Sequence, residues 1–138
     1  MSWFSNLFKS TVTRESANPA GTSSYSRMQV STEAAIWTAR SPERSWAQVA
    51  PTGSMLPVLD SNSILLREKV TGLDLRPGDI ASYDDLHGGT ICHRVREINN
   101  RGAVLFTGDN NSSTSPDGWI PSNRIRFRIA GILYTKPL

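Results

Sequence analysis

Cysteine and long apolar runs are scarce in this sequence, and each absence excludes a class of protein. A single cysteine, Cys92, in 138 residues rules out an internal disulfide and any CxxC metal or redox motif. The longest apolar runs are only a few residues, too short for a transmembrane helix or for the apolar core of a secretory signal. We therefore expect a soluble protein without metal or other cofactor, located in the cytoplasm or in a virion or other assembly.

The length and the charge of the chain set broad limits on its function. A chain of 138 residues fits one domain with a core of modest size. The net charge of +3 comes from twelve arginines and only three lysines, which is a mild excess for this length. A nucleic-acid-binding protein usually gathers such charge on one face, whereas here it is spread along strands and loops. Most of these charges are therefore expected to be solvated surface.

The first thirty residues differ in composition from the rest. Trp3, Phe4, Leu7 and Phe8 recur at the spacing of one helical face, which predicts a short amphipathic segment. Residues 10–28 are rich in Ser, Thr, Asn, Gly and Pro and have no apolar period, as in a linker or extended arm. The short segment could dock on a protein partner, on a membrane surface or on its own domain, and we favour a protein partner.

Residues 31–138 are predicted to form one mainly β domain that follows the N-terminal arm of residues 1–30. Good helix formers at residues 32–40, followed by Ser41-Pro42, predict one short helix. Beyond the helix, short apolar runs alternate with turn residues. These runs predict strands at residues 63–67, 78–83, 90–98, 103–107 and 124–134.

The last predicted strand carries a row of arginines at positions 124, 126 and 128. Ile125, Phe127 and Ile129 alternate with them, so one face is expected to be buried and the other solvated. Together with Arg94 and Arg96 on a neighbouring strand, the row raises the possibility of nucleic-acid binding. No aromatic residue shares that face, as single-strand binding requires, so we favour a solvated face.

The stretch PTGSMLPVLD, around Ser54, is the best candidate for chemistry. Gly53 permits a tight turn and Pro57 prevents a helix, so the Ser54 hydroxyl is expected at the edge of a rigid loop. Met55 and Leu56 are expected to be buried beside it. A loop of this kind can present a nucleophile, although Gly-Ser pairs also occur in ordinary turns.

A serine nucleophile needs a base, and this sequence offers few. Among the lysines only Lys69 could be recruited, and it lies in a predicted polar turn. His87 precedes two glycines in a turn, whereas His93 lies within a predicted strand, where an imidazole can be fixed and partly desolvated. A carboxylate could orient that imidazole. Asp109 and Asp117 are both candidates, and either could instead bond its own loop backbone.

Several short motifs follow one another in a defined order. They read TGSMLPVL, RPGDI, CHRV, TGDNN followed by a later Asp, WIP and IAGILY. In this order and at these separations they resemble the type I signal peptidases and the related LexA-like self-cleaving repressors, over roughly Ala50 to Tyr134. The resemblance implies a twisted, mainly β fold with a substrate groove, and serine endopeptidase activity.

The resemblance also implies roles for individual residues. Ser54 matches the nucleophile and His93 the general base, which is lysine in most bacterial enzymes. A histidine there is similar to the endoplasmic-reticulum and archaeal type, in which a carboxylate completes the site. That carboxylate would be Asp109 or Asp117, of which the later is closer to the family pattern. Thr52 would help the backbone N–H of Ser54 to stabilise the oxyanion.

The expected reaction is hydrolysis of a peptide bond. His93 would accept the Ser54 proton and then donate it to the leaving amine, which suits an imidazole with an unperturbed pKa of about 6.5. The substrate is expected to be a polypeptide that adds as a strand beside the serine loop. Signal peptidases have a transmembrane anchor and this sequence has none, so we expect a soluble enzyme that could process a protein of its own assembly.

Two other functions stay open at this point. The soluble branch of the clan cleaves itself at an Ala-Gly or Cys-Gly bond in an N-terminal arm, and Ala20-Gly21 lies at a similar separation before Ser54. Self-cleavage at this bond is one alternative. The other is a catalytically silent structural or docking module of a larger particle such as a phage virion, tethered by the aromatic segment at residues 3–8.

Overall fold

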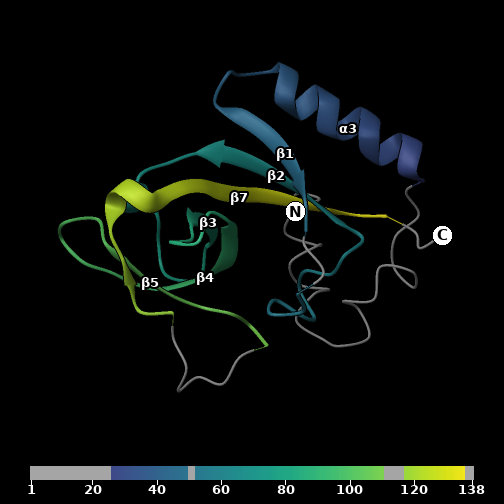
Figure 1. The fold of residues 1–138 in the computed structure, drawn as a ribbon. Coiled ribbons are helices and arrows are strands. Elements are labelled where there is room, and N and C mark those ends of the chain that lie inside the picture. Colours follow the sequence, from purple (N-terminus) through teal and green to yellow (C-terminus); the bar gives the residue numbers. More distant parts are fainter. Residues whose placement is uncertain (1–25, 50–51, 111–116, 136–138) are drawn as a thin grey trace. The chain divides into compact units, whose positions relative to one another are not determined.

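The computed structural model describes residues 26–49, 52–110 and 117–135 of the chain (Figure 1). The predicted amphipathic segment at residues 3–8 lies outside the described residues, and so does the Ala20-Gly21 bond. The expected arm, its tether and the self-cleavage site therefore stay predictions from the sequence.

The fold is mainly β, as predicted. The described residues form one antiparallel sheet of seven strands in the order β1-β2-β7-β3-β4-β5-β6, together with one α-helix, α3. The strands are β1 (Arg44–Gln48), β2 (Ser63–Lys69), β3 (Ile80–Asp84), β4 (Thr90–Ile98), β5 (Val104–Thr107), β6 (Trp119–Ile120) and β7 (Ile125–Tyr134). Short 3-10 turns cover Gly72–Asp74 and Ser122–Arg124.

Two compact units make up the described part of the chain. The first unit runs to Arg67 and includes the C-terminal part from Ala130 onward, and the second unit is Glu68–Ile129. Strand β7 contributes its first half to the second unit and its second half to the first.

All five predicted strands occur, with differences at their ends. Strand β4 has the predicted bounds, whereas β2 extends to Lys69. Lys69 is therefore the exposed last residue of a strand and not part of a polar turn. Strand β3 begins at Ile80 because Asp79 N–H donates to the carbonyl of Arg76, at 3.0 Å, and closes a turn there. The short strands β1 and β6 were not predicted, since neither has an alternating apolar pattern.

Helix α3 spans Arg27–Ala39 and thus begins earlier than the predicted start at residue 32. The cause is a capping box: Ser26 Oγ accepts from Gln29 N–H at 3.2 Å, and Gln29 Oε1 accepts from Ser26 N–H at 2.7 Å. The boundary predicted between residues 30 and 31 falls inside this helix. The predicted end of the helix, just before Ser41-Pro42, is confirmed to within one residue.

Replacing Ser26 with alanine is expected to lower the free energy of unfolding by about 1 kcal/mol, because the backbone N–H of Gln29 loses its acceptor, Ser26 Oγ. Urea denaturation followed by circular dichroism measures this change. Ser31→Ala, an exposed position inside the same helix, is the control and should not destabilise the protein. Equal stability of Ser26→Ala and wild type would show that the cap contributes nothing.

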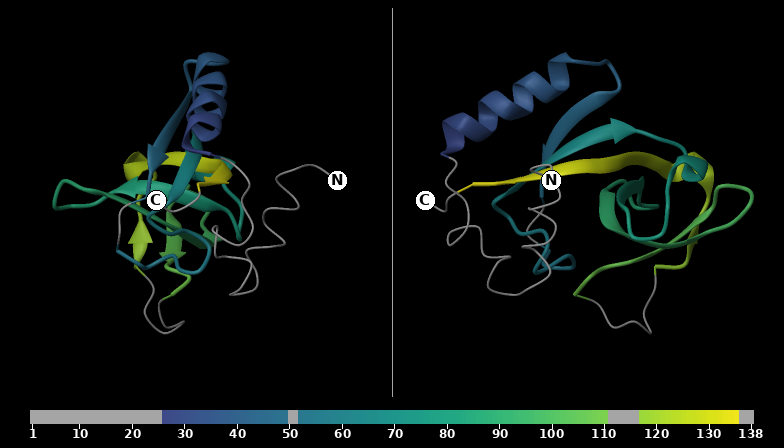
Figure 2. Two further views of the ribbon diagram at one scale, coloured as in Figure 1. Left: turned by 90° about the vertical axis from the view of Figure 1, so that its right-hand side faces the viewer. Right: turned by 180° about the vertical axis from the view of Figure 1, so that it is seen from behind.

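The core of the first unit joins α3 to the sheet. Val30 and Ala34 of the helix are buried with Leu66 of β2 and Leu133 of β7. Figure 2 shows α3 alongside β1 from two further directions. Near the end of the helix, Trp37 Nε1 donates to the carbonyl oxygens of Ser45 and Arg67, both at 3.0 Å, and so links the helix to β1 and β2.

The second unit has its own core, built from strands β3 to β7. Its buried members are Leu75, Ala81, Tyr83, Val95, Val104, Phe106, Ile120 and Ile125. In the β3–β4 ladder, Ala81 pairs with His93 and Tyr83 pairs with Ile91, so Tyr83 and His93 share the face that carries this core. The core therefore fixes the strands that hold the candidate base.

The alternation predicted for β7 is confirmed only in part. Ile125 and Ile129 are buried and Arg126 is exposed, but Phe127 and Arg128 are both half-buried. From residue 131 onward every described residue of the strand is buried, which the sequence pattern did not predict. No helix among the described residues is long and apolar enough to cross a membrane.

Candidate active site

The serine loop is a compact series of turns in the first unit. Gly53 has φ of 76°, and its carbonyl accepts from Leu56 N–H at 3.2 Å, which confirms the expected tight turn. Ser54 is half-buried beside it. Met55 is 3% exposed, as predicted, but Leu56 is 40% exposed, so its predicted burial was wrong. The hydrogen-bonded turn places Leu56 at its outer end, and the next apolar residue to be buried is Val58.

Two further contacts involve the same loop. The Tyr134 hydroxyl donates to the carbonyl of Val58 at 2.6 Å, which ties the loop to the end of β7. Thr52 Oγ1 lies 3.3 Å from Ser54 Oγ, close enough for a hydrogen bond in which either hydroxyl donates. The loop thus holds the Ser54 side chain next to the hydroxyl of Thr52, the residue proposed from the sequence to help stabilise the oxyanion.

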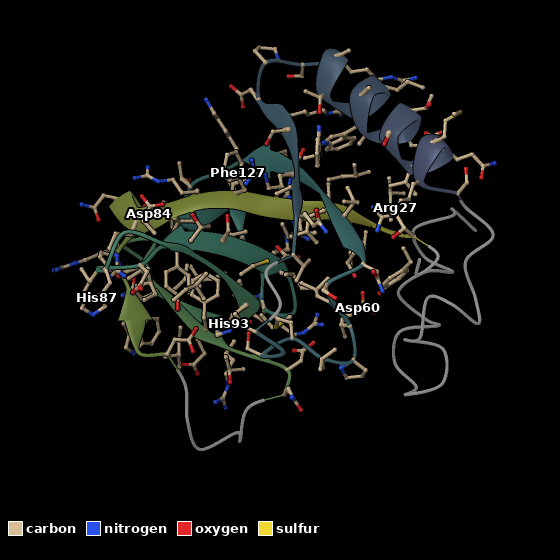
Figure 3. All side chains as sticks on the ribbon, turned by 45° about the vertical axis from the view of Figure 1, so that its right-hand side comes forward. Arg27, Asp60, Asp84, His87, His93 and Phe127 are labelled. Carbon is tan, nitrogen blue, oxygen red and sulfur yellow. The ribbon has the colours of Figure 1, made fainter. Side chains whose placement is uncertain are left out.

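His93 lies on β4 in the second unit and is only 8% exposed. Its Nδ1 donates a hydrogen bond to Oδ2 of Asp117. The other histidine, His87, lies in the exposed turn between β3 and β4, where Gly88 N–H donates to the Asp85 carbonyl at 3.2 Å. Figure 3 shows His87 at the outside of the molecule, away from His93. Only His93 therefore has the fixed, desolvated setting expected of a base.

Asp117 is the aspartate that the structure brings to His93. Its backbone N–H donates to the carbonyl of Phe106 at 2.9 Å, which places the residue beside the end of β5. Its Oδ2 accepts the hydrogen bond from His93 and a second one from the Tyr83 hydroxyl, at 2.7 Å. Two donors converging on one carboxylate oxygen fix both its position and its orientation.

Asp109, the other candidate, is paired with an arginine instead. Arg94 Nε donates to its Oδ1 at 2.8 Å, and Arg94 Nη2 donates to its Oδ2 at 2.6 Å. This two-pronged hydrogen bond raises the pKa of the Arg94 guanidinium above its ordinary value. Arg94 Nη1 also donates to the carbonyl of Gly78 at 2.8 Å. Because His93 and Arg94 are consecutive on a strand, they point to opposite faces and separate the two aspartates.

Tyr83 belongs to the site, and the sequence analysis did not single it out. It is 3% exposed and packs against Phe106, with the ring centroids 4.7 Å apart. Burial raises the pKa of the Tyr83 phenol well above its ordinary value, and the hydrogen bond and negative charge of Asp117 raise it further. The hydroxyl is therefore a permanent donor at neutral pH.

These contacts define what the site can do chemically. The Nδ1–H of His93 is engaged with Asp117, and in the neutral imidazole this leaves Nε2 as the proton acceptor. Lys69 is exposed, whereas a lysine base requires strong burial to lose its proton. Among the candidate bases, His93 has the surroundings that proton transfer needs.

Arg124, in the 3-10 turn before β7, and Arg126 and Arg128 of β7 are all engaged within the second unit. Arg124 Nε donates to the Asp84 carbonyl at 2.8 Å, and Arg126 Nε donates to the Asp84 carboxylate at 2.7 Å. Arg128 Nε donates to Glu68 Oε1 at 2.9 Å. The hydrogen bond from Arg126 lowers the pKa of Asp84. These guanidinium groups are thus balanced by neighbouring acceptors, which favours the solvated face over a nucleic-acid-binding one.

Metal binding and cysteine chemistry are the other kinds of site to consider. Across residues 26–49, 52–110 and 117–135, no three His, Cys, Asp or Glu side chains gather in a way that could hold a metal ion. Cys92, the single cysteine of the sequence, is half-buried. Comparisons with protein-family models, with curated proteins and with solved structures give no match to this chain.

Proposed function

We propose that this protein is a serine endopeptidase in which Ser54 is the nucleophile, His93 the general base and Asp117 the carboxylate that orients the base. The observation that carries the proposal is the hydrogen bond from His93 Nδ1 to Asp117 Oδ2. In serine peptidases this pairing holds the imidazole in the productive tautomer and stabilises the imidazolium that forms during the reaction. The order of the motifs further supports a signal-peptidase-like or LexA-like twisted β fold.

The proposed reaction begins with attack of Ser54 Oγ on the carbonyl carbon of a peptide bond. His93 Nε2 takes the proton from the hydroxyl as the new C–O bond forms. The imidazolium then gives this proton to the leaving amine as the C–N bond breaks, and an acyl-enzyme remains on Ser54. Water hydrolyses the acyl-enzyme by the same route, with His93 again accepting and returning one proton.

Stabilisation of the oxyanion is assigned to the serine loop. The backbone N–H of Ser54 and the hydroxyl of Thr52 are the proposed donors. Thr52 Oγ1 lies 3.3 Å from Ser54 Oγ, so it is close to where the reacting carbonyl would be attacked. The proposed substrate is a polypeptide that adds as a strand beside this loop, in the protein's own assembly.

A purely structural role explains the site less well. His93, Asp117 and Tyr83 are held in one hydrogen-bonded group with little exposure to solvent. Polar and charged groups in such a position cost free energy of desolvation, which well-packed apolar side chains would not. A docking module has no use for this arrangement, whereas a general base does.

The proposal is tested by acylation with N-acetyl-alanine p-nitrophenyl ester, followed by release of p-nitrophenolate and by peptide mapping. Wild type is expected to carry an acyl group on Ser54, and Ser54→Ala and His93→Ala are expected to carry none. Ser61→Ala and His87→Ala are the matched controls, because both are exposed in turns and should acylate as wild type does. Intact mass from the same sample also reports any cleavage at Ala20-Gly21.

Folded wild-type protein that stays unacylated at Ser54 would reject the proposed activity and favour a structural or docking module. Acylation of His93→Ala at the wild-type rate would reject His93 as the base. Circular dichroism of each variant shows whether loss of acylation reflects loss of the fold.

A further inference from the structure

Tyr83 lies at an irregularity in the sheet beside the candidate base. In the ladder between β3 and β7, Ser82 pairs with Phe127 but Tyr83 pairs with Ile125, so the register shifts between Ser82 and Tyr83. A β-bulge of this kind changes the direction of a side chain, and such bulges are frequent next to active sites. The extra residue is Arg126 of β7, which lies opposite the step from Ser82 to Tyr83.

The other neighbour of β3 places Tyr83 close to His93. Ala81 is opposite His93 in the β3–β4 ladder and Tyr83 is two residues further along β3. Tyr83 and His93 are thus diagonal neighbours on one face, within reach of a common partner for two long side chains. That partner is Oδ2 of Asp117, to which both of them donate.

The Tyr83 ring is held on more than one side. Its centroid is 4.7 Å from that of Phe106, and the guanidinium carbon of Arg124 lies 5.8 Å from the Tyr83 centroid. The side chain is almost fully buried. A ring fixed by packing brings its hydroxyl to one place, so the hydroxyl can serve as a rigid support for the carboxylate.

We propose that Tyr83 is a positioning residue of this site: its hydroxyl holds Oδ2 of Asp117 in place for His93 Nδ1, and through Asp117 it orients the imidazole that takes the Ser54 proton. This inference rests on the proposed function. It assigns a task to a residue outside the Ser-His-Asp group, and it explains why the same carboxylate oxygen receives both donors.

A simpler explanation is that Asp117 only accepts the hydrogen bond that the buried Tyr83 hydroxyl needs, as buried tyrosine hydroxyls generally have a partner. The two explanations differ in what the hydroxyl controls. If the Tyr83 hydroxyl merely finds an acceptor in Asp117, removing the hydroxyl changes the stability of the protein and leaves the acylation of Ser54 unchanged. If it positions Asp117, its removal slows proton transfer in protein that is fully folded.

The test is Tyr83→Phe, which keeps the ring and removes the hydroxyl. Acylation of the full chain by N-acetyl-alanine p-nitrophenyl ester is measured over a range of ester concentrations. We expect the limiting rate to fall about tenfold, because the base is no longer held in its productive orientation, while the half-saturating concentration stays unchanged. Thr135→Val is the matched control: it also removes a hydroxyl, one that donates to the Asn62 carbonyl at 3.0 Å, without changing volume.

A second readout is the proton NMR resonance of His93 Nδ1–H. If the Tyr83 hydroxyl holds Asp117 in line with Nδ1–H, its loss should weaken the Nδ1–H bond and move the resonance upfield. If the hydroxyl is only a competing donor, its loss should strengthen that bond and move the resonance downfield. Thr135→Val should leave the resonance unchanged. This signal reports the position of the carboxylate and does not depend on turnover.

The outcomes separate the two proposals. A wild-type limiting rate in folded Tyr83→Phe, with wild type itself acylated, overturns the role of Tyr83 and leaves the peptidase proposal standing. If wild type is not acylated, the peptidase proposal fails and the NMR readout alone decides: an unchanged or downfield-shifted His93 resonance in Tyr83→Phe overturns the inference, and an upfield shift supports the positioning of Asp117 by Tyr83.

Discussion

Asp117→Asn is expected to lower the limiting rate of Ser54 acylation by about 10⁴-fold. The amide has no negative charge to stabilise the imidazolium that forms when His93 takes the proton. Its NH₂ group can also present a donor to Nδ1, which would move the ring proton to Nε2 and remove the lone pair that acts as the base. The side chain keeps its shape, so the contact with Tyr83 and the fold should persist. Stopped-flow release of p-nitrophenolate from the alanine ester measures the rate.

Asp109→Asn is the matched control for this prediction. It makes the same chemical change at an aspartate that is paired with Arg94 and not with His93. Its acylation rate should fall far less than that of Asp117→Asn, although the variant should be less stable by about 2 kcal/mol through the weakened bond to a charged group. Similar losses of rate in both variants would contradict the assignment of Asp117 as the orienting carboxylate.

The sequence was sufficient to place His93 because local signals define its strand. The run TICHRVREI lies between a glycine-containing turn and a second turn at Asn99 to Gly102, and its predicted bounds agree with those of β4. Such a strand, flanked on both sides by turns, fixes which residues alternate between its faces. The burial of His93 and the exposure of His87 follow from this local pattern.

The choice between Asp109 and Asp117 could not be made in this way. Both lie in one polar loop, and which of them reaches His93 depends on where the chain returns to the sheet. The return is fixed by the bond from Asp117 N–H to the Phe106 carbonyl, a contact between distant parts of the loop and β5 that no local motif encodes. A bidentate arginine partner for Asp109 likewise depends on the register of strands.

Tyr83 was missed for a related reason. In the sequence it is one more apolar residue at the end of the run GDIASY, which reads as a core strand. Its hydroxyl meets Asp117 because the β3–β4 register makes Tyr83 a diagonal neighbour of His93. By contrast, the early start of α3 could have been found, since Ser26 and Gln29 have the spacing of a capping box.

Gly72→Ala is expected to cost about 3 kcal/mol of folding free energy, through a clash that the backbone must relieve. A Cβ on Gly72 would lie 1.7 Å from the carbonyl oxygen of Gly102 and 2.7 Å from its carbonyl carbon. Both are main-chain atoms of the β4–β5 turn, so no side chain can rotate to make room. The 3-10 turn that starts at Gly72 and the hairpin that ends in β5 would have to move apart.

This separation would disturb the second unit as a whole, because β5 supplies Val104 and Phe106 to its core and the Phe106 carbonyl holds Asp117. Differential scanning calorimetry should show a fall in Tm of about 10 °C. Gly89→Ala is the control: its Cβ would meet no atom within 4 Å, so its Tm should stay within a degree or two of wild type. A wild-type Tm for Gly72→Ala would mean that the two turns do not approach each other as closely as this structure places them. Loss of acylation in Gly72→Ala that is recovered on cooling below its Tm would show that the packing of the second unit is what keeps Asp117 at His93.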